Sequence, residues 1–299
     1  MSYSAEISRN NPTAFLFAID RSGSMSETTP EGFPKAQMLS DVMNRLFSEL
    51  ILKCTKAEGV RNYFEIGVIG YDSVAGITNP LPGELVGNWL NPVSLFETNP
   101  LRLEERVKKI PDGAGGVLET SIRFPVWFDP VSQGGTPMCA AMSKAYDVLS
   151  HWCKNHPNAY PPLLVHVTDG QSTDGDPEAI AKDIQQLSTE DGNVLVFNIH
   201  LSKQGGREMM FPSSAKKLPD SYAEKLFNMS SQLPESIAKL ALIEEIEGVS
   251  SDSRGFAYQV SDLASLVAFL DIGTRAATDT VESDRGLWLG NLFFTNNIS

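Results

Sequence analysis

A run of five apolar residues at positions 15–19 (FLFAI) ends abruptly in DRSGS at positions 20–24. The run has the length of a buried strand, and turn-forming residues follow it. A carboxylate placed directly after a buried strand costs free energy unless it has a partner. The oxygen donors Asp20, Ser22 and Ser24 recur at every second position of the loop, a pattern that suits a hard divalent cation. We therefore expect this strand end to hold part of an oxygen-lined metal site.

The chain beyond this strand alternates between helical and strand-like periodicity. The clearest helix begins at Pro34, because apolar residues recur at helical spacing from Met38 to Ile51. Further helices are expected at 137–156, from 176, from 221, at 234–247 and at 261–278, and further strands at 63–71, 163–167, 194–201 and 256–260. This alternation predicts an α/β fold, with a doubly wound, mostly parallel sheet covered by helices on both faces.

We expect one large domain at 13–278, preceded by a polar N-terminal extension at 1–12 and followed by a tail at 279–299. Two segments of the domain depart from the regular alternation. They are an insertion at about 72–134 and an elaborated segment at about 202–250. The length of the first argues against a structureless loop, since such loops are uncommon in compact domains.

The insertion at 72–134 is rich in Pro, Gly and Asn. Within it we expect a helix at 101–110 and an aromatic strand-like piece at 122–128, which Pro125 confines to a sheet edge or a bulge. The tail contains a stretch at 287–294 that is too apolar for a solvated chain end. That stretch either packs back onto the domain or docks onto a partner.

A second aspartate follows a second predicted strand. Asp169 comes after the strand at 163–167 as Asp20 comes after the first, and ligands of open α/β sheets bind beyond the carboxyl ends of the strands. The sequence GGTP at 134–137 leads into a helix and brings the Thr136 hydroxyl to the same edge. The expected metal ligands are the hydroxyls of Ser22, Ser24 and Thr136 and the carboxylates of Asp20 and Asp169, directly or through water. These oxygens suit Mg²⁺, with one position left for water or an outside carboxylate.

The three motifs together resemble the metal-ion-dependent adhesion site of the von Willebrand factor A (vWA) domain family, in the family's order. They are DxSxS after an apolar strand (Asp20, Ser22, Ser24), GGTP before a helix (Thr136) and TDG at a strand end (Asp169). The resemblance implies the doubly wound fold and Mg²⁺-dependent capture of a Glu or Asp carboxylate from a partner protein, with Mn²⁺ or Ca²⁺ as alternative ions. It also implies a bacterial intracellular adaptor in multi-protein systems, such as those of stress and defence, rather than an enzyme.

Composition limits the other functional classes. The net charge of −13 argues against nucleic-acid binding, which uses basic patches to displace counterions. The sequence contains no run of about 18 apolar residues, so no membrane span is expected. The polar start of the chain does not have a signal-peptide pattern. Three cysteines, Cys54, Cys139 and Cys153, form an odd set without metal-ligand spacing. These features favour a cytoplasmic protein.

Two alternatives stay open. The first is a metal-dependent hydrolase in which the cation activates water, although the sequence shows no general base tied to the site and no GxSxG motif. The second is an extracellular adhesin, which the polar N-terminus and the odd cysteine count oppose. The four histidines include no metal-ligand pair, and His166, which lies within a strand, is expected to be a core residue rather than a base.

Overall fold

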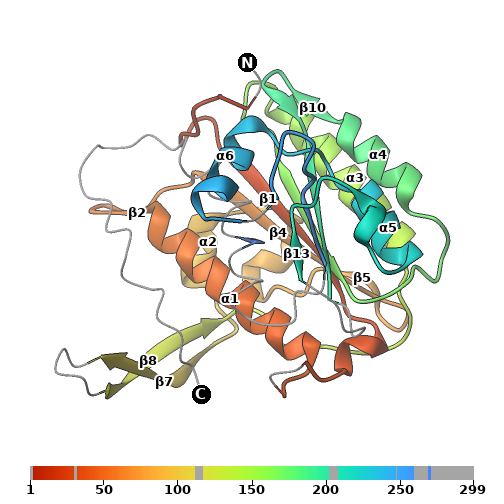
Figure 1. Cartoon of the computed structure of the whole chain (residues 1–299). Coiled ribbons are helices and arrows are strands. Elements are labelled where there is room, and N and C mark those ends of the chain that lie inside the picture. The colour runs from red at the N-terminus through yellow and green to blue at the C-terminus, as the bar shows by residue number, and fades with distance from the viewer. Residues whose placement is uncertain are drawn as a thin grey trace.

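The computed structural model describes residues 3–29, 32–111, 117–201, 208–246, 248–258 and 269–270. At its centre is an eight-stranded sheet in the order β13-β14-β12-β9-β1-β4-β5, with β6 beside β4 (Figure 1). The five parallel strands are β1 (Thr13–Asp20), β4 (Phe64–Asp72), β9 (Leu163–Thr168), β12 (Leu195–His200) and β14 (Phe256–Tyr258). The antiparallel strands are β5 (Gly76–Thr78), β6 (Asn91–Pro92) and β13 (Met209–Met210). The predicted α/β fold with a mostly parallel sheet is therefore confirmed.

All eight residues of β1 are buried, because β1 lies between β4 and β9 and is covered on both faces. Side chains alternate across the sheet. The residues from Phe15 to Ile19 at odd positions enter one hydrophobic cluster, and those from Ala14 to Ala18 at even positions enter the other. A strand buried on both faces reads as a continuous apolar run, which explains why the sequence alone predicts this segment.

Helices cover the two faces as two layers. The face that receives the β1 phenylalanines packs against α1 (Lys35–Cys54), α2 (Val93–Thr98) and α6 (Glu235–Ile243). The opposite face packs against α3 (Met138–Asn155), α4 (Glu178–Gln186) and α5 (Ser221–Asn228). Figure 1 shows the two groups on either side of the sheet. None of the helices in the described ranges is long and apolar enough to cross a membrane.

The insertion contains β5, η2 (Gly83–Gly87), β6, α2 and a long hairpin of β7 (Arg102–Pro111) and β8 (Val117–Val126). The helix expected at 101–110 is wrong, because this segment is β7. Its backbone bonds to β8 over ten residue pairs, a non-local pairing that the local sequence pattern did not indicate. The strand-like piece expected at 122–128 largely coincides with β8. The hairpin projects from the body of the molecule (Figure 1).

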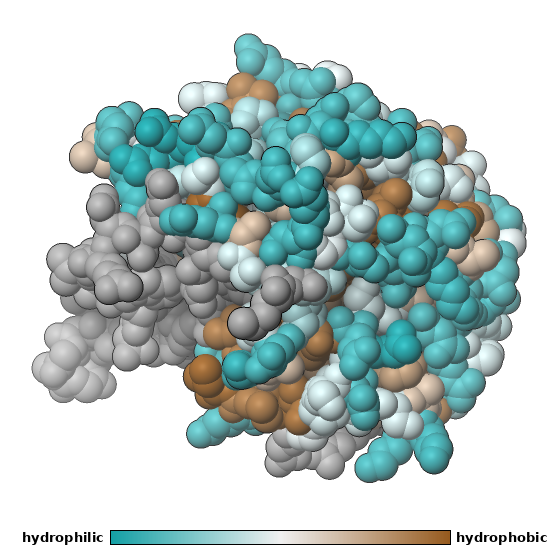
Figure 2. Space-filling model, turned by 90° about the horizontal axis from the view of Figure 1, so that it is seen from above, coloured by the Kyte–Doolittle hydropathy of each residue, from teal (hydrophilic) through white to brown (hydrophobic). Residues whose placement is uncertain are grey.

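The other elements within the described residues are short. They are η1 (Gly23–Ser26), η3 (Ala215–Lys217) and two small hairpins, β2 (Thr55–Lys56) with β3 (Gly59–Val60) and β10 (Ser188–Thr189) with β11 (Gly192–Asn193). The helix expected at 261–278, apart from residues 269 and 270, and the apolar tail lie outside the described residues. Seen from above, the surface is mostly hydrophilic, with its largest hydrophobic cluster toward the lower edge of the view (Figure 2).

Candidate metal centre

Asp20 is the last residue of β1, and its side chain is held from two directions. The Ser22 backbone N–H donates to Oδ1 at 2.8 Å, and the Thr168 hydroxyl donates to Oδ2 at 2.6 Å. Thr168 ends β9, the neighbouring parallel strand. The carboxylate is therefore fixed at the carboxyl edge of the sheet by its own loop and by the adjacent strand end.

Burial dominates the electrostatics of Asp20, which is 1% exposed. Burial raises the pKa of the Asp20 carboxyl to about 6, although hydrogen bonds from Ser22 and Thr168 lower it, and the nearby Asp169 raises it further. The charged form is thus less well solvated in the folded protein than in water. A cation beside this carboxylate would offset that deficit.

Two serine hydroxyls and the second aspartate lie next to one another. Ser22 Oγ and Ser24 Oγ are 3.1 Å apart, and Ser24 Oγ donates to Asp169 Oδ1 at 2.6 Å. Neighbouring oxygens around an octahedral Mg²⁺, with bonds near 2.1 Å, are roughly 3 Å apart. The spacing of the two serine hydroxyls therefore matches that of neighbouring ligands of a small divalent cation, and Ser24 and Asp169 lie somewhat closer together.

The glycine loop before α3 is clamped against the Ser22–Ser24 loop. Gly134 has a φ of +65°, a conformation that favours glycine, and its carbonyl accepts from the Gly23 N–H at 2.9 Å. Thr136 N–H donates to the Thr173 hydroxyl at 3.1 Å, and the Thr136 carbonyl accepts from the Thr173 N–H at 2.9 Å. These bonds fix the backbone on both sides of the Thr136 hydroxyl.

Gly170 shows that the hydroxyls of separate loops converge. A Cβ placed on Gly170 would lie 3.8 Å from Ser24 Oγ and 3.9 Å from Thr136 Oγ1. Both hydroxyls therefore face the same small space beside Asp169. Thr136 is 5% exposed, so its hydroxyl is shielded from bulk water.

The structure thus brings together all five residues that the sequence singled out: Asp20, Ser22, Ser24, Thr136 and Asp169. Across the described parts of the chain, no three His, Cys, Asp or Glu side chains gather into a metal-ligand group. Two of the five residues carry carboxylates, and the other ligands would be hydroxyls. This donor set fits a hard cation such as Mg²⁺ and does not fit a soft metal. Metal binding itself stays a prediction.

Sequence reasoning did not identify Lys35. Its ammonium donates to Asp169 Oδ2 at 2.7 Å and to Glu27 Oε2 at 3.0 Å, and its side chain is 5% exposed. One local signal could have drawn attention to it: a lysine in the first turn of a helix opposes the helix dipole. Thr168 was also overlooked, although it belongs to the TDG motif.

A buried polar chain continues from the site into the core. Tyr71, the register partner of Asp20 on β4, donates its hydroxyl to His166 Nε2 at 2.6 Å. His166 Nδ1–H donates to Asn198 Oδ1 at 2.9 Å, and Asn198 Nδ2 donates to Ser230 Oγ at 2.9 Å. Burial lowers the pKa of His166 to about 4, so its ring is neutral. The expectation that His166 is a hydrogen-bonded core residue is confirmed.

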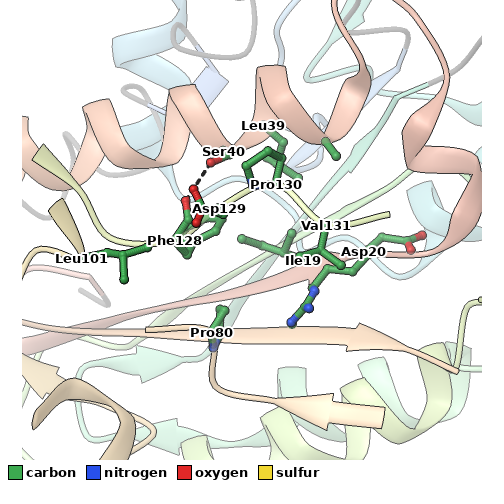
Figure 3. A pocket seen from close by; sticks show the side chains of 13 residues that line it. Ile19, Asp20, Leu39, Ser40, Pro80, Leu101, Phe128, Asp129, Pro130 and Val131 are labelled. Carbon is green, nitrogen blue, oxygen red and sulfur yellow. Dashed lines mark hydrogen bonds between the residues drawn. The ribbon is translucent and has the colours of Figure 1, made fainter. Parts of the chain in front are cut away.

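A cavity of about 250 Å³ lies beside the end of β1 (Figure 3). Its lining is mostly apolar and includes Ile19, Leu39 and Phe128. The Ser40 hydroxyl donates to the Phe128 carbonyl at 2.9 Å and ties α1 to the opposite wall. Asp20 also borders this cavity, but its carboxylate points away from it (Figure 3), so the cavity adjoins the oxygen cluster without containing it.

Comparison with known proteins gives only distant likenesses. No protein-family model and no curated protein sequence matches this chain. Among solved structures, the pilus adhesin SpaC from Lactobacillus rhamnosus GG matches with a TM-score of 0.48 at 12% identity, over 92% of this chain and 31% of SpaC. Proximal thread matrix protein 1 from the mussel byssus matches with a TM-score of 0.47 at 14% identity, over 90% of this chain and 48% of that one.

The vWF domain of the type V pili tip protein Mfa5 from Porphyromonas gingivalis is also similar, with a TM-score of 0.28 at 15% identity over 54% of this chain and 39% of that one. The chain spans about a third to a half of the length of these three proteins. The solved structures that are similar to this chain therefore include a vWF domain. The similarity is too low to indicate a function.

Proposed function

We propose that this chain is a protein-binding module of the vWA type that captures an acidic residue of a partner protein through Mg²⁺. The ion would be held by Asp20, Ser22, Ser24, Thr136 and Asp169, and the carboxylate of the partner would complete its coordination. As its setting we propose an adaptor role in a bacterial multi-protein system, such as one of stress or defence. Mn²⁺ and Ca²⁺ are the alternative ions.

The observation that carries this proposal is the convergence of oxygens from three separate loops at one edge of the sheet. Ser24 contacts Asp169 directly, and Ser24 and Thr136 both face Gly170. The protein would supply only two negative charges, so the bound cation would remain electrophilic toward an outside carboxylate. When bound, the ion would attract the carboxylate of the partner, and the protein would hold the ion in a fixed position.

The partners of the hydroxyls favour binding over hydrolysis by a serine nucleophile. Ser24 donates to Asp169 and lies beside Ser22, and in the part of the chain that the structure describes neither hydroxyl is paired with a histidine base. A nucleophilic serine needs such a base. His166 is committed at both ring nitrogens to Tyr71 and Asn198.

The proposal is tested by thermal unfolding with and without Mg²⁺. A ligand that binds only the native state raises the melting temperature, so Mg²⁺ should stabilise the wild type. Thr136→Ala removes one proposed ligand and should abolish this shift while leaving the metal-free melting temperature nearly unchanged. Thr98→Ala, at an exposed hydroxyl outside the site, is the matched control and should respond like the wild type. An equal shift in Thr136→Ala would refute the metal site.

The partner is sought by affinity capture from a lysate of the organism that makes the protein. The full chain should retain a partner in Mg²⁺ and release it in chelator, and Thr136→Ala should retain none. We further propose a cytoplasmic location, which the free thiols of Cys54, Cys139 and Cys153 support because disulfides are rare in reducing compartments. Cell fractionation tests this part separately, and recovery outside the cytoplasm would favour an adhesin.

A further inference from the structure

Lys35 places a positive charge inside the proposed metal site. It is the first residue of α1, and its ammonium contacts both Asp169 at 2.7 Å and Glu27 at 3.0 Å. The backbone repeats the connection, because the Lys35 N–H donates to the Glu27 carbonyl at 2.9 Å. Lys35 is therefore tied to the segment that follows Ser24 as well as to the strand end that carries Asp169.

Two physical costs oppose a lysine at this position. The amino end of a helix carries partial positive charge, and the first turn of α1 contains no acidic residue to offset it. Burial adds the desolvation cost of an ammonium group. Asp169 and Glu27 offset these costs, and the side chain of Asp169 is fully buried. The charge of this buried lysine therefore affects the candidate metal site directly.

Both oxygens of Asp169 are engaged by this arrangement. Oδ1 accepts from the Ser24 hydroxyl at 2.6 Å, and Oδ2 accepts from Lys35. The ammonium consequently holds the carboxylate against Ser24 and cancels much of its charge. A divalent cation entering beside Ser24 would be repelled by the ammonium, since charges a few ångströms apart interact strongly in a partly buried site.

We infer that Lys35 is a resident counter-cation that weakens metal binding by the free protein and thereby couples metal binding to the arrival of the partner's carboxylate. This inference rests on the proposed function. Lys35 neutralises much of the negative charge of Asp169, and an incoming carboxylate restores negative charge at the site. The carboxylate therefore favours metal binding, and by linkage the metal favours carboxylate binding. When a cation coordinates Asp169, the Lys35 ammonium would still have Glu27 as an acceptor.

The experiment measures Mn²⁺ binding to the metal-free full chain by electron paramagnetic resonance of the free ion. Lys35→Gln should bind Mn²⁺ more tightly than the wild type, by roughly tenfold or more. Lys35→Arg keeps the charge and should bind like the wild type. Lys182→Gln removes an exposed lysine paired with Glu178 on α4 and is the matched control, with no expected change.

Acetate serves as the probe for the outside carboxylate. It should tighten Mn²⁺ binding to the wild type and have a smaller effect on Lys35→Gln. Equal effects of acetate on the two proteins, including no effect on either, would overturn the coupling. The metal-free melting temperature should fall in Lys35→Gln even as its metal affinity rises, because Asp169 and Glu27 lose their shared partner. A merely structural lysine would lower stability without raising affinity.

The remaining outcomes separate the two proposals. If Asp20→Asn loses Mn²⁺ binding but Lys35→Gln binds no more tightly than the wild type, the counter-cation role is wrong and the proposed function stands. If neither the wild type nor Lys35→Gln binds Mn²⁺ with acetate present, or if Asp20→Asn binds it as well as the wild type, the proposed function fails as well. Lys35→Met keeps the apolar stem and replaces Lys35→Gln if the latter does not fold. If neither folds, the ammonium is a structural requirement and the inference is overturned.

Discussion

Asp20 and His166 are buried titratable residues on the adjacent strands β1 and β9, and burial moves their pKa values in opposite directions. The pKa of Asp20 is raised to about 6, so the folded protein binds more protons than the unfolded chain between about pH 4 and pH 6. The pKa of His166 is lowered to about 4, so the unfolded chain binds more protons between about pH 4 and pH 6.5.

The signs of the two contributions to stability follow from this difference. For Asp20, stability present at low pH is lost as the pH rises through about 6. For His166, stability present above about pH 6.5 is lost as the pH falls toward 4. Each amounts to about 3 kcal/mol, because one pKa unit corresponds to about 1.4 kcal/mol. Over this pH window the two contributions nearly cancel in the wild type.

Asp20→Asn should unmask the His166 contribution. In chelator, this variant should be more stable than the wild type at pH 7.5, by about 1–3 kcal/mol, because it removes a buried charge. Its stability should fall steeply between pH 6.5 and 4, as followed by urea unfolding. His166→Gln should show the opposite slope. A pH profile of Asp20→Asn parallel to that of the wild type would contradict this account.

Asp72 is the matched control for Asp20, since it is also a buried aspartate that ends a strand. Both carboxylates accept two short hydrogen bonds, those of Asp72 coming from the N–H groups of Val74 and Ala75. Asp72 differs in having a cation nearby, because its Oδ2 lies 3.7 Å from the Arg21 guanidinium. Asp72→Asn should therefore destabilise the protein where Asp20→Asn stabilises it. The difference in stability between the two variants would measure the cost of burying the Asp20 carboxylate without a nearby cation.

At the level of elements, Arg106 is one link between the β7–β8 hairpin and the body of the molecule. Arg106 on β7 pairs with Asp41 of α1 at 2.8 Å and with Glu104 at 2.9 Å, and its guanidinium lies 3.9 Å from the Phe124 ring centre. An isolated two-stranded hairpin is marginally stable in water. The contacts of Arg106 therefore help to fix the hairpin against α1.

Arg106→Ala should loosen the hairpin without unfolding the protein. The expected loss of global stability is about 0.5–1 kcal/mol, whereas amide hydrogen exchange across β7 and β8 should accelerate markedly. Arg45→Ala, which breaks an Arg45–Glu49 pair within α1, is the control and should leave exchange in the hairpin unchanged. Unchanged exchange in Arg106→Ala would show that other contacts hold the hairpin.

The residue that caps the start of α5 differs from the one that the sequence pattern indicates. The sequence pattern suggests a capping box between Ser221 and Glu224, but the cap is Asp220, whose Oδ1 accepts from the N–H groups of Tyr222 and Ala223 at 2.9 and 2.8 Å. Both patterns place a suitable oxygen near the first turn, and the local sequence alone does not choose between them.

Asp220→Ala should destabilise the protein by about 1 kcal/mol, because two helix N–H groups lose their acceptor. Ser221→Ala, one residue along, should change stability much less. Chemical denaturation of the two variants side by side provides the measurement. The reverse order of stabilities would restore Ser221 as the cap.

At the scale of the whole molecule, the sequence was most informative where local pattern and tertiary role coincide. The strand at 15–19 and the helix from Pro34 could be predicted because burial imposes their periodicity. The oxygen donors of the candidate site could be predicted because parallel strands deliver their ends to one edge. The β7–β8 hairpin and Lys35 could not, since both depend on contacts between distant segments, such as Lys35 with Asp169, 134 positions apart.

The central place of β1 also has a mechanical consequence. Asp20 terminates a strand that is paired in register over eight residues with β4 and over five with β9. A pull on anything held at Asp20 would run along the axis of β1 and load the hydrogen bonds on both sides in shear. Those bonds would then resist together instead of opening one at a time, so tension from a tethered partner would be spread across the middle of the sheet.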